Sequence, residues 1–174
     1  MTPALTRRAA LRAAGLAGAA LAAGAAPARA VRAGEGDSGL IGELKSAELV
    51  SIAAAERTLG GLGAAQRRTV RRLRAQDQEH AAALTTVLAG FGIEPEAALP
   101  PAPGPVLAAA GAVRRARRGR RRLAALLALE EAVAAAYRDA LPDLREPDVV
   151  RTAGSVLAGE AGHVVALRAT LGRV

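Results

Sequence analysis

Two histidines, each placed three residues after an acidic residue, occur in matching positions in the two halves of the chain. They form the pairs Asp77-x-x-His80 and Glu160-x-x-His163, and the 174 residues contain no other histidine. A further glutamate precedes each pair by 29 or 30 residues. The six positions are Glu48, Asp77, His80, Glu130, Glu160 and His163. Residues three apart share one face of an α-helix, so the repeat favours two helical hairpins that turn the same polar groups towards each other.

The composition indicates an all-α protein. Ala and Leu dominate, and the chain has one Phe, one Tyr and no Trp. Apolar stripes at helical spacing carry the six polar positions and predict four helices, at residues 38–59, 64–89, 123–141 and 147–171. Asp37 or Ser38 is the expected N-cap of the first helix. The Pro-rich segment 93–105 begins a long crossover between the second and third helices, with a helical piece at 106–113 and a break at Gly119.

The positions of the turns determine the height of the polar groups, that is, their position along the helix axes. Residues equidistant from the turn of an antiparallel hairpin lie at the same height. The midpoint between positions 48 and 77 falls at Leu62 or Gly63, in a glycine-rich turn, and the midpoint between 130 and 160 falls at Arg145, in a Pro-bounded turn. The first glutamate of each half is therefore level with the acid–histidine pair of its hairpin. We expect an antiparallel four-helix bundle with all six groups at mid-height.

Carboxylates on apolar stripes need a compensating positive charge. Burial of one unpartnered carboxylate costs several kcal/mol, and four of them would rival the net stability of a domain, about 5–15 kcal/mol. The arginines fall mostly outside the stripes. Two divalent cations would balance four carboxylates, and carboxylates combined with imidazoles suit Fe, Mn or Zn better than Mg or Ca.

A known family carries this pattern. Glu130 with Tyr137 seven residues later, followed by Glu160-x-x-His163, resembles the ferritin-like di-iron carboxylate superfamily, whose ligands are a Glu on each of two helices and Glu-x-x-His on two others. More narrowly, the chain is similar to exported bacterial ferritin-like proteins with twin-arginine signals. The resemblance implies a bundle over residues 40–171 that binds two Fe or Mn ions through the six positions, with Tyr137 beside them. It also implies ferroxidase or peroxide-scavenging chemistry with O2 or peroxide.

The chain departs from the family pattern at three points. Asp77 stands where glutamate is usual, and its shorter side chain leaves open whether it bridges two metals, binds one or fails to reach. Ala55 occupies the position after Glu48 at which a second tyrosine would match Tyr137. No cysteine-rich electron-transfer module is present. These departures bear on redox cycling more than on metal binding.

Alternatives remain open for several positions. Glu56 competes with Glu48, and Glu131 competes with Glu130, although the turn midpoints favour Glu48 and the register of Tyr137 favours Glu130. Tyr137 is also explained as a core aromatic. The alternative function is a non-catalytic bundle whose degenerate metal site is a remnant and which acts as a stress-related or envelope-binding module. A cage that stores iron is a third hypothesis, and a homo-oligomer is compatible with each.

The N-terminal residues predict export. Arg7 and Arg8 resemble the twin-arginine motif, an Ala/Gly/Leu stretch follows, and Ala28-Arg29-Ala30 fits the small-x-small cleavage rule. We expect a signal peptide at residues 1–30, a flexible leader at 31–37 and the bundle at 38–174. The predicted location is the periplasm, cell envelope or extracellular space. Because the chain has no cysteine, disulfides, iron–sulfur clusters and rubredoxin-type sites are excluded.

The chain is basic, with a net charge of +8, and its arginines form runs at residues 67–74 and 114–122. Such runs can bind an anionic envelope surface, or they can form an ordinary solvated face in a chain rich in arginine. The predicted export argues against nucleic acid as a partner. So does the lack of aromatic residues interleaved with the arginines.

Overall fold

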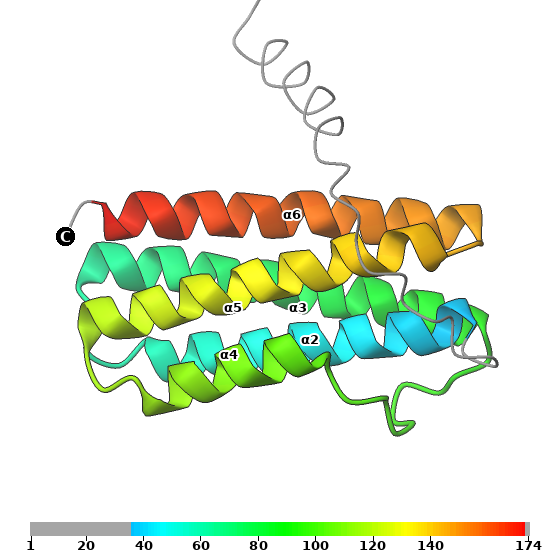
Figure 1. Cartoon of the computed structure of the whole chain (residues 1–174), viewed down its shortest axis with the longest axis horizontal. Coiled ribbons are helices and arrows are strands. Elements are labelled where there is room, and N and C mark those ends of the chain that lie inside the picture. The colour runs from blue at the N-terminus through cyan, green and yellow to red at the C-terminus, as the bar shows by residue number, and fades with distance from the viewer. Residues whose placement is uncertain (1–35, 173–174) are drawn as a thin grey trace, which may run out of the picture. The chain divides into compact units, whose positions relative to one another are not determined.

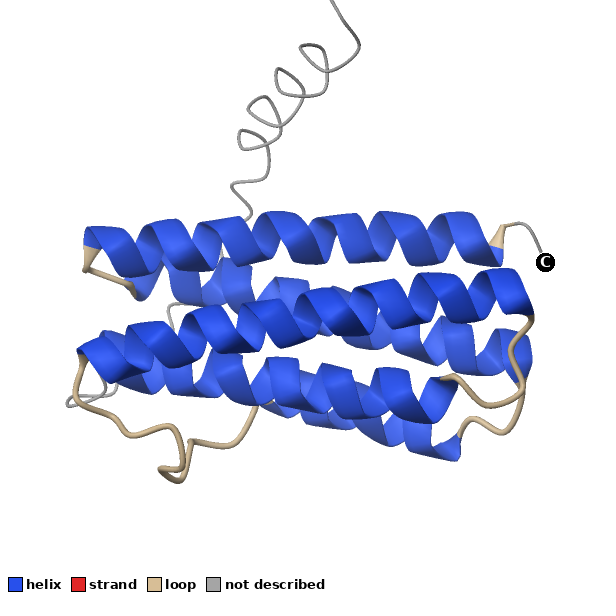
Figure 2. Cartoon of the chain, turned by 180° about the vertical axis from the view of Figure 1, so that it is seen from behind, coloured by secondary structure: helices blue, strands red, loops and turns tan. Residues whose placement is uncertain are grey.

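The computed structural model describes residues 36–172, and helices make up most of them. The five α-helices of this part of the chain are α2 (Asp37–Thr58), α3 (Ala64–Gly90), α4 (Gly104–Arg115), α5 (Gly119–Ala140) and α6 (Pro147–Leu171). A short 3-10 helix, η1 (Leu141–Asp143), lies between α5 and α6, and the described residues contain no strand (Figure 2). The all-α class is confirmed. The predicted signal peptide and nearly all of the predicted leader lie outside the described residues.

Turn residues explain where the helices begin and end. Gly61, with a φ of 79°, lies in the turn between α2 and α3, and Gly92, with a φ of 75°, follows α3. Both angles are in the left-handed region that glycine adopts without strain. Pro147 occupies the first turn of α6, where its missing N–H costs no hydrogen bond. Helix α5 begins at Gly119, four residues before the predicted start, because its arginines are good helix formers and Gly119 ends the preceding turn.

The role expected for Asp37 is corrected by the structure. Gly36 is the N-cap of α2, and no side chain caps that helix end. The carboxylate of Asp37 instead accepts hydrogen bonds from the backbone N–H groups of Arg145 (3.1 Å) and Glu146 (2.8 Å). These N–H groups lie at the start of α6, where a helix leaves its donors unpaired and favours a negative charge. Asp37 therefore ties the beginning of α2 to the beginning of α6.

The long helices pack as two hairpins. Helix α2 packs against α3 and α5 packs against α6, while α2 also contacts α5 and α3 contacts α6. Figure 1 shows that α2 and α3 run in opposite directions, as do α5 and α6. Helix α4, which extends the expected helical piece, lies within the crossover and packs against α2 and α5. None of the helices in residues 36–172 is both long and apolar enough to span a membrane.

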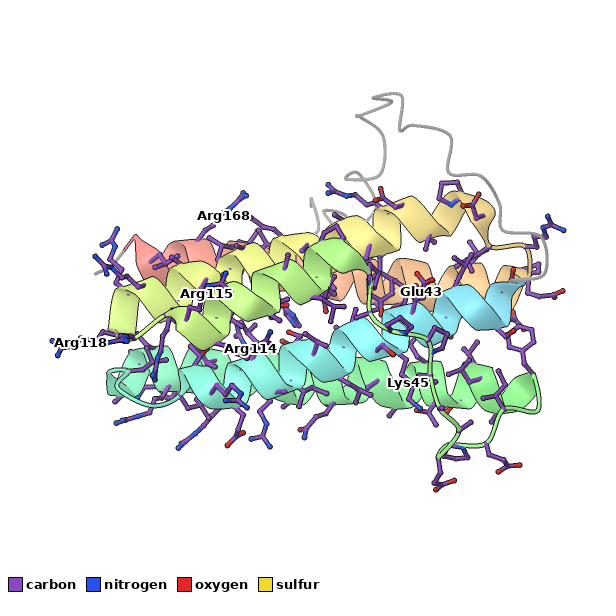
Figure 3. The ribbon with its side chains drawn as sticks, turned by 60° about the horizontal axis from the view of Figure 1, so that its bottom comes forward. Glu43, Lys45, Arg114, Arg115, Arg118 and Arg168 are labelled. Atoms are coloured by element: carbon purple, nitrogen blue, oxygen red, sulfur yellow. The ribbon has the colours of Figure 1, made fainter. Side chains whose placement is uncertain are left out.

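One end of the bundle carries both arginine runs. Helix α3 begins at the end where α2 stops, and Arg122 near the start of α5 donates hydrogen bonds to the carbonyl oxygens of Gly60 (2.8 Å) and Ala116 (3.1 Å). That side chain thus joins the turn before α3 to the turn before α5. Figure 3 shows Arg118 at this end, far from Lys45. The positions of the turns therefore place the positive charge of both arginine runs at the same end of the bundle.

The core consists mainly of aliphatic side chains between the helices. Leu44, Leu73, Leu126 and Leu167, one from each long helix, are at most 1% exposed. Tyr137 is the largest fully buried side chain of residues 36–172. Five ionisable groups lie at the same depth as these apolar residues. They are Glu48, Asp77, Glu130, Glu160 and His163. Such burial is costly unless the charges compensate one another or bind a cation.

Candidate metal centre

The structure brings all six sequence-predicted residues into one cluster. Helices α2 and α5 each contribute one glutamate, and α3 and α6 each contribute one acid–histidine pair. The four carboxylates are fully buried and His163 is 1% exposed. Only the side chain of His80, at 15%, has appreciable exposure. The acid-x-x-His spacing turns both members of each pair inward because residues three apart share a helix face.

The cluster divides into two overlapping groups of potential ligand atoms. In each group the atoms lie within 4.8 Å of one another. The first group consists of Glu48, Asp77, His80 and Glu160. The second consists of Asp77, Glu130, Glu160 and His163. Asp77 and Glu160 belong to both groups, so the shorter side chain of Asp77 does reach the middle of the cluster.

Both imidazoles present Nδ1 to the carboxylates. His80 Nδ1 lies 2.9 Å from Glu160 Oε1 and 3.5 Å from Glu48 Oε2. His163 Nδ1 lies 3.2 Å from Asp77 Oδ1 and 3.4 Å from oxygens of both Glu130 and Glu160. The two rings are stacked, with centroids 5.5 Å apart and an interplanar angle of 21°. The histidines therefore face the same set of oxygens from α3 and α6.

Two hydroxyl groups orient the outer glutamates. Tyr137 on α5 donates a hydrogen bond of 2.7 Å to Glu48 on α2. Ser51 on α2 donates one of 2.6 Å to Glu130 on α5. Each hydroxyl thus comes from the hairpin opposite to the glutamate that it contacts. Sequence reasoning placed Tyr137 beside the site but missed Ser51, whose only signal is its place one turn after Glu48 on the same buried face.

Burial raises the affinity of three carboxylates for protons. It raises the pKa of Glu48 to about 7, although a hydrogen bond with His80 acts in the opposite direction. It raises the pKa of Glu130 to about 8 despite a hydrogen bond with His163. The pKa of Asp77 is also raised, first by burial. An apolar environment disfavours the charged form of each acid.

Glu160 and the histidines show the opposite balance. Burial raises the pKa of Glu160, but hydrogen bonds from His163 and His80 outweigh it and lower the pKa to about 2. Burial lowers the pKa of both histidines, but their hydrogen bonds to the carboxylates raise it, to about 9 for His80 and about 12 for His163. Without metal, the cluster therefore holds imidazolium groups around an ionised Glu160.

Several buried atoms of the cluster make no well-aligned hydrogen bond within residues 36–172, although two of the oxygens lie 3.2 and 3.5 Å from an imidazole Nδ1. They are Glu48 Oε2, both carboxylate oxygens of Asp77, Glu160 Oε2 and His163 Nε2. Four of these five atoms are carboxylate oxygens, the atoms that a cation binds. Buried polar atoms are rarely left unpaired. The donor set and its unpaired oxygens fit two divalent ions that prefer carboxylate and imidazole ligands.

The two rival glutamates lie outside this cluster. Glu56 forms a 2.8 Å ion pair with Arg74, and Glu131 forms a 2.6 Å ion pair with Arg168. Their side chains are 58% and 42% exposed. Both therefore belong to solvated helix faces.

Comparison with known proteins identifies one family. The family model for the ferritin-like domain matches residues 12–173. No curated protein and no solved structure gave a significant match to the chain.

Proposed function

Because the chain belongs to the ferritin-like domain family, we propose that it binds two Fe or Mn ions in the buried cluster and that O2 or peroxide reacts there. The observation that carries the proposal is the pair of four-residue groups that share Asp77 and Glu160. Two ligand groups that share two residues are the arrangement that two neighbouring ions require. Two divalent charges would also balance the four buried carboxylates.

The residues divide between the two ions by proximity. Glu48 and His80 would hold one ion and Glu130 and His163 the other, with Asp77 and Glu160 as ligand candidates common to both groups. Bound Fe or Mn would supply the electrons for the reduction of O2 or peroxide, in a ferroxidase or peroxide-scavenging reaction.

The surrounding residues prepare the site for such chemistry. Aliphatic side chains exclude water from the buried carboxylates, which strengthens every electrostatic interaction there. Ser51 and Tyr137 hold their glutamates in fixed orientations, as second-layer groups of metal sites do. Burial and the nearby Glu48 raise the pKa of Tyr137, so its hydroxyl keeps its proton and remains a hydrogen-bond donor. Of the six positions His80 is the most exposed, so oxidant would approach beside it.

Neighbouring glutamates provide matched controls for a test of metal binding. We expect about two Fe or Mn ions per chain by elemental analysis of the native protein. Glu130→Gln should lose at least one ion, whereas Glu131→Gln, one residue away and exposed, should keep both. An equal loss in the two variants, or metal-free native protein, would refute the ligand assignment. Oxidation of added Fe(II) under O2 and under peroxide then tests the catalytic part of the proposal.

One observation favours the non-catalytic alternative. The histidines and the buried acids satisfy part of one another's charge without any metal, since the pKa values of both histidines are raised by hydrogen bonds to the carboxylates. A bundle could persist with protons in place of ions. In that case the chelated protein would melt at the same temperature as the untreated protein, because no ligand would stabilise the native state.

We also propose that α2, α3, α5 and α6 are the antiparallel four-helix bundle of the family, with α4 as an insertion in the crossover.

Export by the twin-arginine route is a further proposal, based on Arg7 and Arg8. Replacement of both by lysine should keep the protein in the cytoplasm. Contact of the basic end with an anionic envelope surface is testable by sedimentation with anionic vesicles, and binding should weaken steeply with salt.

A further inference from the structure

An open groove runs between α3 and α6 on the side of the cluster where the histidines lie. One part has a volume of about 390 Å³ and is lined by residues that include Arg72, Gln76, Gly162 and His163. A second part, of about 400 Å³, continues from Arg72 to Arg68 and Thr170. No carboxylate lines either part of the groove. Since a water molecule occupies about 30 Å³, the groove can hold a small molecule as well as solvent.

One residue that lines the groove, His163, has a buried polar atom without a partner. His163 is 1% exposed, and its Nε2 has no hydrogen bond within the described residues. Its other ring nitrogen, Nδ1, faces the carboxylates, so Nε2 is on the opposite edge of the ring. A histidine that ligates a metal through Nδ1 carries its proton on Nε2 and almost always donates it to an acceptor. No side chain in residues 36–172 accepts this hydrogen bond.

The polar groups that line the groove with His163 include donors and a positive charge. Arg72 carries a guanidinium that forms no ion pair with another described residue, and the NH2 group of the Gln76 amide can donate. Beside His163, α6 contributes small residues to this lining, and a Cβ atom at one of them, Gly162, would meet nothing within 4 Å, so the groove is open there. Several donors, a positive charge and no carboxylate match the chemistry of an oxyanion.

We propose that this groove binds a small oxyanion, a carboxylate or a phosphate group, between Arg72 and the Nε2–H group of His163. The inference rests on the proposed function in one respect, that the Nδ1 atom of His163 ligates a metal and leaves Nε2 as a donor. The bound anion completes the hydrogen bonding of a metal-ligating histidine. It also places the anionic end of an organic ligand next to the metal centre, and the arginines extend the groove for the rest of such a ligand.

Isothermal titration of the purified protein with sodium phosphate, and separately with sodium acetate, tests the proposal at constant ionic strength. We expect one saturable site per chain for at least one probe, and the probe that binds identifies the source as phosphate or carboxylate. Arg72→Gln should weaken binding about tenfold or more, since a charged hydrogen bond is lost. Arg71→Gln removes the same charge outside the groove and should change the affinity less than about twofold.

A second pair of variants separates filling of the groove from loss of the fold. A Cβ atom at Gly162 or at Gly154 would meet nothing within 4 Å, but only Gly162 lines the groove. Gly162→Leu should abolish anion binding and Gly154→Leu should preserve it, while both retain helical circular dichroism.

Three results would overturn the proposal. They are the absence of a saturable site for either probe, equal weakening by the two arginine variants, and unchanged binding in Gly162→Leu. Elemental analysis of the same samples keeps the two proposals apart. Two ions per chain without an anion site would refute the groove alone, whereas an anion site without metal would refute the metal centre and show that Nε2 donates without metal on Nδ1.

Discussion

Gly159 should control how tightly one of the two ions is held. It precedes Glu160 on α6, and a Cβ atom at this position would lie 2.7 Å from Nε2 and 2.8 Å from Cε1 of His80. Ordinary contact begins at 3.4 Å. In Gly159→Ala the imidazole must therefore move by about 0.7 Å away from α6. That helix carries Glu160, whose Oε1 is 2.9 Å from His80 Nδ1.

The magnitude follows from the tolerance of metal coordination. A displacement of about 0.7 Å is several times the tolerance of about 0.2 Å for metal–ligand distances. Disturbance of the groups that orient a ligand usually costs about 10–100-fold in metal affinity. His163 contacts the other ligand group, so the second ion should be less affected. We therefore expect Gly159→Ala to retain one ion tightly and to lose the other under conditions in which the native protein holds two.

Gly154→Ala is the matched control. It makes the same change on the same helix, and its new Cβ would meet nothing within 4 Å. The alanine at position 154 should add up to about 1 kcal/mol of helix stability, whereas at position 159 the displacement of His80 offsets this gain. Titration with a competing chelator gives the two metal affinities, and thermal melting of the metal-free proteins reports the fold. The reasoning is refuted if Gly159→Ala binds both ions with native affinity, or if Gly154→Ala loses an ion as readily.

Other predictions concern stability. Chelation should lower the melting temperature by about 10 °C, because one site at a hundredfold excess over Kd contributes about 2.7 kcal/mol; calorimetry with and without chelator measures this shift. The metal-free protein should lose stability as pH rises from 5 to 9, because folding raises the pKa of Glu130 from 4.5 to about 8. The stabilisation that comes from protonated Glu130 is complete below pH 4.5 and is lost as pH rises through 8. The raised pKa of His163 also lowers stability as pH rises above 6.5. Metal-loaded protein should instead gain stability as pH rises, because protons compete with metal for the ligands. Urea titrations at several pH values distinguish the metal-free from the metal-loaded protein. Tyr137→Phe should cost the metal-free protein about 1–3 kcal/mol, because it removes the donor to buried Glu48; denaturant unfolding that shows no loss would contradict this role.

Much of the fold could be predicted from the chain's local patterns. The bounds of α2, α3 and α6 lie within one residue of the expected ones, since glycine turns and Pro147 interrupt strong apolar stripes. The start of α5 was missed because the arginine run after Gly119 shows no apolar periodicity. The role of Asp37 was also missed, because an acid at a helix start is a common cap, and only the neighbouring α6 shows which N–H groups it contacts.

The location of the candidate ligands was also predictable in part. Helical spacing and the turn midpoints placed Glu48 level with Asp77, and Glu130 level with Glu160, and the structure brings all of them together. The same reasoning separated Glu48 from Glu56, which pairs with Arg74 on the surface. Whether these residues bind metal stays a prediction.

By itself, the sequence determined the helices, their inward faces and the height of each polar group within its own hairpin, because these depend on the period of the α-helix and on the position of the turn. Only the tertiary structure decided the contacts between hairpins. Ser51 meets Glu130, Tyr137 meets Glu48, and the α3–α6 groove borders the cluster at His163. These contacts depend on the rotation and offset of one hairpin against the other. That docking results from the packing of all the core side chains together, so no local pattern in the chain specifies it.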